Sequence, residues 1–82
     1  MQFPKHKAGL MLFHNDHKNN YESAEAWVTA QTDYDWPSSI AKQRAIETDS
    51  IWTLTWYPET PIGSLSIAAP TLEELLEFAN SL

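Results

Sequence analysis

Cysteine is absent from this chain of 82 residues, and glycine occurs only twice. Without a thiol the chain can form neither a disulfide framework nor a thiolate zinc site, which is typical of proteins that fold in a reducing cytosol. Two glycines are too few for a Gly-rich phosphate-binding loop, and no Gly-x-Ser-x-Gly element marks a serine nucleophile. The sequence therefore favours a protein without a cofactor, and it favours a non-enzymatic role over catalysis.

Basic residues are also scarce, with five Lys and Arg against eleven Asp and Glu, for a net charge of −6. Residues 1–20 hold three Lys and one Asp, so they carry +2, and the rest of the chain carries −8. No basic residue follows Arg44. Because nucleic-acid affinity comes mainly from Lys and Arg, we expect no direct nucleic-acid binding. The excess of acid either keeps a small protein soluble or matches a basic surface on a partner protein.

Long hydrophobic runs are missing as well, since the longest extends only from Ala8 to Phe13. That is too short to span a membrane, and Met1 to Lys5 shows no signal-peptide character. We expect a single domain over residues 1–82, with a cytoplasmic location and no membrane contact. A chain of this length buries only about 60% of its unfolded surface, so its four Trp, three Tyr and three Phe must supply much of the core.

The second half of the chain predicts two strands and a helix. Apolar and polar residues alternate over 52–57, which indicates a strand with one buried face, and Pro58 to Gly63 reverses the chain. The return strand covers 64–68. Thr71 then caps a helix, with Glu74 at the capping-box spacing. The apolar stripe of that helix contains Leu72, Leu75, Leu76 and Ala79.

The first half predicts a strand and two helices. The apolar run Gly9 to His14 is typical of a central strand covered on both faces, and the polar run Asn15 to Asn20 indicates a loop. Helices are expected from Asn19 or Ser23 to about Gln31, and from about Pro37 to Ile46. The order β-α-α-β-β-α predicts an α+β fold, with a three-stranded sheet and helices packed on one face.

Metal-ligand residue types gather only at His14, Asp16 and His17. Imidazole and carboxylate groups suit zinc, iron or manganese, but a further ligand such as His6 would be needed. A metal-binding module or metal-dependent enzyme is thus one alternative. The other is that His14 ends a strand while Asp16 and His17 belong to a solvated loop.

Aromatic and acidic residues alternate in the segment Asp33-Tyr34-Asp35-Trp36-Pro37. Exposed Tyr and Trp in such a loop have the composition of an interface anchor. Alternatively, Trp36 folds back over the edge of the core. Trp52 and Trp56 are expected in the core, which would leave the opposite sheet face uncovered. A partner could dock on that face, or a second copy of the chain could pair with an edge strand as a homodimer.

The segment from Gln43 through the Trp56-Tyr57-Pro58 hairpin to the Thr71-Leu72-Glu73-Glu74 helix resembles short accessory proteins of tailed bacteriophages. The resemblance covers roughly the second half of the chain, and its motif contains no catalytic residue. It implies a setting in which small, acidic, cysteine-free proteins bind and disable a host enzyme or defence complex, including CRISPR systems.

These observations favour a small acidic protein that binds a basic surface on a host protein, in the host cytoplasm, and inhibits or redirects it. The acidic face would steer the encounter and the exposed aromatic rings would supply affinity. The candidate partner-binding residues are Asp33, Tyr34, Asp35, Trp36, Glu47, Asp49 and Glu59.

Overall fold

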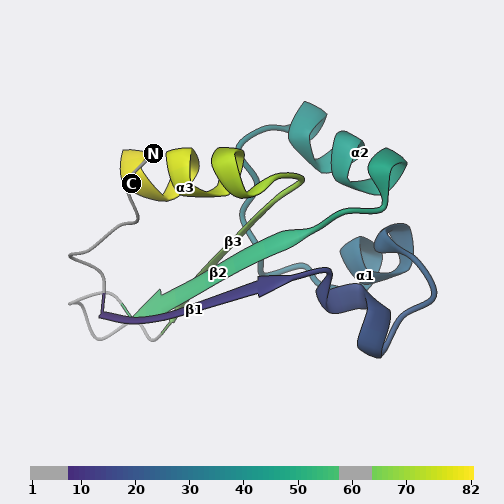
Figure 1. Cartoon of the computed structure of the whole chain (residues 1–82), viewed down its shortest axis with the longest axis horizontal. Helices are drawn as coiled ribbons and strands as arrows, with labels where there is room; N and C mark the ends of the chain where they lie inside the picture. Colours follow the sequence, from purple (N-terminus) through teal and green to yellow (C-terminus); the bar gives the residue numbers. More distant parts are fainter. Residues whose placement is uncertain (1–7, 58–63) are drawn as a thin grey trace.

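The protein has an α+β fold in a computed structural model that describes residues 8–57 and 64–82 (Figure 1). The predicted order of strands and helices is confirmed. The elements are β1 (Ala8–His14), the 3-10 helix η1 (Asp16–Asn19), α1 (Ala24–Ala30), α2 (Ser39–Thr48), β2 (Trp52–Tyr57), β3 (Leu65–Ala69) and α3 (Leu72–Ser81). The predicted reversal at Pro58 to Gly63 and the candidate residue Glu59 lie outside the described residues.

The three strands form an antiparallel sheet in the order β1-β2-β3, so β2 is central. The prediction that the first strand is central and covered on both faces is wrong, because β1 lies at an edge. Met11 and Phe13 are 41% and 54% exposed. The uncharged composition of β1 resembles that of a buried strand, but the helices make most of their sheet contacts with β2 and β3. Of β1, Leu10 packs against the cluster under α3.

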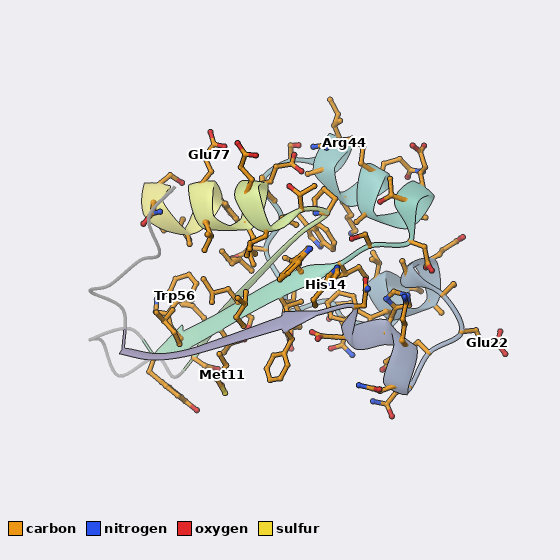
Figure 2. All side chains as sticks on the ribbon, viewed as in Figure 1. Met11, His14, Glu22, Arg44, Trp56 and Glu77 are labelled. Carbon is orange, nitrogen blue, oxygen red and sulfur yellow. The ribbon has the colours of Figure 1, made fainter. Side chains whose placement is uncertain are left out.

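One face of the sheet packs against α3. Leu54 of β2 and Ile67 of β3 lie opposite each other in register, and both are buried with Leu75 of α3. Trp56 also belongs to this cluster, as predicted, and Figure 2 shows its ring on the side of the sheet that faces α3. Alternation along the strands and the i, i+3, i+4 spacing of α3 therefore build this half of the core, as expected.

A second cluster joins α1 and α2 to the end of the sheet. Trp27 and Val28 of α1 are buried with Ala45 of α2 and Ala68 of β3. Ile51, just before β2, is also fully buried there. The expected uncovered face is therefore covered at this end, while Tyr57 of β2 and the neighbouring Met11 and Phe13 of β1 are exposed on it.

Each of the helices α1, α2 and α3 begins at a hydroxyl side chain. Ser23, Ser38 and Thr71 accept hydrogen bonds from the amides three residues on, which satisfies donors that the first helical turn leaves free. The predicted caps Ser23 and Thr71 are confirmed. The second helix begins at Ser39, two residues after Pro37, with Ser38 as its cap. The polar run after β1, expected to be a loop, contains the short helix η1.

Candidate interaction site

The predicted anchor loop runs along the outer edge of β3. The Asp35 amide donates to the Ser66 carbonyl at 3.1 Å, and the Ala68 amide donates to the Asp35 carbonyl at 2.9 Å. These bonds form a parallel bridge between Asp35 and Ile67. The backbone of this loop thus extends the sheet by one short step, which leaves the side chains of Asp33 and Asp35 exposed to solvent.

The two aromatic rings of this loop turn inward. Tyr34 and Trp36 are half-buried and pack on the cluster that contains Trp27, with ring centroids of Trp27 and Tyr34 4.9 Å apart. Burial raises the pKa of the Tyr34 phenol above its ordinary value of 10.0, and the Asp16 carboxylate raises that pKa further. Of the two interpretations of Trp36, folding back over the core edge is the one that the structure shows. The acids of the loop, rather than its rings, face outward.

The remaining predicted acids lie near the end of α2. Glu47 is exposed and accepts a hydrogen bond from the Gln43 amide group at 3.4 Å. Asp49 follows α2 in a left-handed conformation with φ 53°. Its Oδ1 accepts the Ala24 amide at 3.0 Å and lies 3.1 Å from His17 Nε2. Asp49 therefore ties the start of α1 to the end of α2, which is a structural role that its position in the sequence did not reveal.

The three predicted metal-ligand residues have separate partners. The His14 ring stacks on Trp52 with centroids 3.9 Å apart. Asp16 accepts a hydrogen bond from the Thr53 hydroxyl, and buried His17 pairs with Asp49. Within the described part of the chain, no group of three or more His, Cys, Asp or Glu side chains could hold a metal ion. His6, the further ligand that such a site requires, lies outside it.

A groove of about 370 Å³ separates α2 from α3. Pro37 and Phe78 supply apolar surface, and Glu74 and Glu77 supply carboxylates. The full lining is Pro37, Ser38, Ala41, Glu74, Glu77, Phe78 and Ser81. Pro37, the last residue of the anchor loop, also lines the groove, so the loop and the groove are joined along the chain. We call the groove and this loop together the acidic groove.

The carboxylates of the groove differ in their partners. Glu74 forms a two-pronged ion pair with the guanidinium of Arg44 and accepts the Thr71 hydroxyl at 2.9 Å. Arg44 is the main cause that holds the pKa of Glu74 below its ordinary value of 4.5. Glu77 has no ion pair or hydrogen bond with any described side chain, and Figure 2 shows it pointing away from the sheet. Among the described residues, Glu77 is thus the groove carboxylate that has no cationic partner.

Sequence reasoning did not find the α3 side of this site. Its signal was present, since α3 carries Glu73, Glu74 and Glu77 without a basic residue. On the sequence alone the three acids fit a solvated helix face. Only the packing of α2 beside α3 shows that two of them border a groove with Phe78.

A separate apolar patch lies on the sheet. Met11 and Phe13 of β1 and Tyr57 of β2 are exposed, and Figure 2 shows Met11 on the side of the sheet away from α3. Gly9 has φ +66°, and a Cβ built there would lie 2.6 Å from Cδ2 of Tyr57. The Tyr57 ring therefore lies over the Gly9 backbone, where only glycine leaves enough space.

Comparison with protein-family models, curated proteins and solved structures finds no match to this chain. Within residues 8–57 and 64–82, no helix combines the length and the apolar character that crossing a membrane would require.

Proposed function

We propose that this protein is a non-enzymatic binding protein that takes a basic segment of a partner protein into the acidic groove. One observation carries this proposal: the groove between α2 and α3 combines the apolar surface of Phe78 with the carboxylate of Glu77, which has no ion pair among the described residues. A side chain with an apolar stem and a cationic head matches both parts.

Arginine or lysine has this chemistry. The stem of either residue can lie along Phe78 while the cationic head reaches Glu77, and a charge-assisted hydrogen bond to a carboxylate is stronger than a neutral one. The protein already contains one such arrangement, because Arg44 of α2 reaches across to Glu74 of α3. A partner's cation would extend this network to Glu77.

The charge of the whole chain supports the same partner. A net charge of −6 attracts a basic surface over a distance and speeds the encounter. Under this proposal the partner is a host protein whose basic surface normally serves nucleic acid or another acidic ligand, and the protein inhibits or redirects it. The resemblance to phage accessory proteins favours a defence or nucleic-acid-processing complex as the target, with the host cytoplasm as the place of action.

A charge reversal inside the groove tests the proposal. Immobilised wild-type protein, Glu77→Lys and Glu22→Lys are each used to capture proteins from a bacterial lysate, followed by mass spectrometry. Both variants change the net charge equally, because each replaces Glu by Lys. Glu22 is the control because it precedes α1, is exposed, and lies far from Glu77 in Figure 2. We expect a basic protein that wild type and Glu22→Lys capture and that Glu77→Lys loses.

A small probe checks the same site without a lysate. Titration of the isotope-labelled protein with N-acetyl-arginine amide should shift the amide signals of Ala41, Glu77 and Phe78, and the shifts should weaken in high salt. Equal capture by the two charge variants, or arginine-dependent shifts that avoid the groove, would show that the acidic groove is not the binding site.

A further inference from the structure

The outer edge of β1 has unpaired backbone groups. The Asn15 amide donates to the Ile51 carbonyl at 2.6 Å, which continues the ladder between β1 and β2. Bonding alternates along an antiparallel strand, so the backbone groups of Phe13 and Met11 also face β2. Those of Leu12 and His14 therefore point outward. Within the described residues, no segment pairs with this edge.

Apart from an irregularity in register between Ala8 and Met11, this edge lacks the features that normally keep strands apart. Natural edge strands carry Lys or Pro, or are covered by another segment. The sequence of β1, AGLMLFH, contains no Pro, Lys, Arg, Asp or Glu. The opposite edge of the sheet, on β3, is instead occupied by the bridge from Asp35. Within the described residues the two edges thus differ: the edge of β3 is bridged at Ile67, and the edge of β1 is open.

Side chains on both faces of β1 are available for contact. Met11 and Phe13 are exposed on the face away from α3, opposite Thr55 and Thr53 in register. Leu12 is 36% exposed on the other face, where it lies opposite Leu54. Any strand added to β1 would cover apolar surface on both faces of the sheet.

We propose that β1 pairs antiparallel with β1 of a second copy of this chain, about a two-fold axis at Leu12, to give a continuous six-stranded sheet. In this register Leu12 lies opposite its own counterpart, so the outward backbone groups of both strands meet. Met11 of each copy then lies beside Phe13 of the other. Contacts between sulfur and an aromatic ring are favourable, so the arrangement is self-complementary.

Charge favours the edge of β1 over the acidic surfaces of the described residues as the contact between two copies. Two copies that met through α3 would bring Glu73, Glu74 and Glu77 against one another, and contact through the loop at Asp33 and Asp35 would do the same. The β1 strand has no formal charge, so pairing it with itself places no like charges directly opposite. The acidic groove stays open in the dimer, so this inference does not depend on the proposed function.

Light scattering coupled to size-exclusion chromatography tests the dimer with a matched pair of variants. Leu12→Lys would place two ammonium groups directly opposite across the axis. Leu65→Lys changes an equally apolar residue, 41% exposed, on the other edge strand β3, and alters the net charge by the same amount. We expect twice the mass of the chain for wild type and Leu65→Lys. Leu12→Lys should raise the dimer dissociation constant by about tenfold or more.

Amide hydrogen exchange of the wild-type protein gives a second readout that needs no variant. In the dimer, the amides of Leu12 and His14 exchange slowly at high protein concentration and faster on dilution. A wild-type mass of one chain at every concentration would overturn the proposal, as would a Leu12→Lys dimer as tight as wild type. Fast exchange at Leu12 and His14 that does not depend on concentration would also overturn the dimer. The remaining partner for the edge of β1 would then be a strand from another protein.

Discussion

At position 9, both the backbone conformation and the packing of a neighbouring side chain favour glycine. Its φ of +66° disfavours any side chain, and Tyr57 occupies the space that a Cβ would need. Replacement of Gly9 by Ala should therefore lower the free energy of unfolding by about 1 to 2 kcal/mol, which urea denaturation would measure.

A double-mutant cycle with Tyr57→Ala separates the two causes. If the contact with the ring contributes, Gly9→Ala costs less in the Tyr57→Ala background, where only the strained φ remains. A cost that is the same in both backgrounds would mean that the ring moves away freely. A cost near zero in both would mean that position 9 does not require glycine.

Asp49 makes the stability of the fold depend on pH in acidic solution. The Ala24 amide, and then the His17 side chain, hold the pKa of the Asp49 carboxyl below its ordinary value of 3.8. A carboxyl whose pKa is lowered by folding stabilises the protein above its ordinary pKa, and this stabilisation is lost as the pH falls through the lowered value. The melting temperature of the wild type should thus fall as the pH drops below about 5.

Asp49→Asn isolates this contribution. Asn tolerates the left-handed conformation and can still accept the Ala24 amide, so the variant should fold, with a smaller fall in melting temperature on acidification. Asp33→Asn is the matched control, because Asp33 is exposed and should leave the wild-type dependence unchanged. Equal pH profiles for Asp49→Asn and wild type would contradict the prediction.

At the scale of the element, α3 depends on its first turn. The Thr71 hydroxyl accepts the Glu74 amide at 3.2 Å and donates to the Glu74 carboxylate at 2.9 Å. Removal of both bonds by Thr71→Ala should cost about 1 kcal/mol, or about 4 to 8 °C in melting temperature.

Thr48→Ala provides the comparison for this capping effect. Thr48 lies at the end of α2, where its hydroxyl donates back to the Arg44 carbonyl at 2.7 Å. Such a bond adds little to a helix, and Ala is the better helix former, so we expect a change within about 0.5 kcal/mol. Equal losses for the two Thr→Ala variants would show that capping does not explain the effect at Thr71.

Local signals explain why the elements could be predicted. Alternation over 52–57, the capping box at Thr71 and the stripe of α3 are all readable within a few residues, and the structure confirms them. The position of β1 could not be predicted in this way. Whether an apolar strand is central or at an edge depends on which helices cover it, and α3 is separated from β1 by most of the chain.

In the candidate site, too, local features could be predicted from the sequence and contacts between distant elements could not. The sequence identified the loop from Asp33 to Trp36, but not that its rings face inward. The α3 side of the groove, with Glu77 and Phe78, became visible only when α2 and α3 were placed side by side. A site formed by two helices far apart in sequence leaves no spacing signature that sequence analysis can detect.

At the scale of the whole molecule, two hydrophobic clusters share one sheet. Leu54 belongs to the cluster under α3, and Val28 to the cluster around α1. In a domain of this size we expect both clusters to unfold together. Leu54→Ala should cost about 2 to 5 kcal/mol and Val28→Ala about 1 to 3 kcal/mol, each in a single transition.

Two optical probes test this cooperativity. Urea unfolding followed by tryptophan fluorescence and by circular dichroism should coincide in wild type and in both variants. Ile40→Ala, at a residue that is 70% exposed on α2, should change stability by less than about 0.5 kcal/mol. If Val28→Ala separated the two probes, the α1 cluster would be an independent unit.

The bridge from Asp35 to β3 also limits the size of any assembly. A sheet with two open edges can recruit further copies at both ends and grow into a filament without a defined length. Among the described residues, the loop at Asp35 bridges β3 at Ile67, while the outer edge of β1 is unpaired. In the proposed dimer both β1 edges are used, so further growth through strands would have to displace the bridge from Asp35.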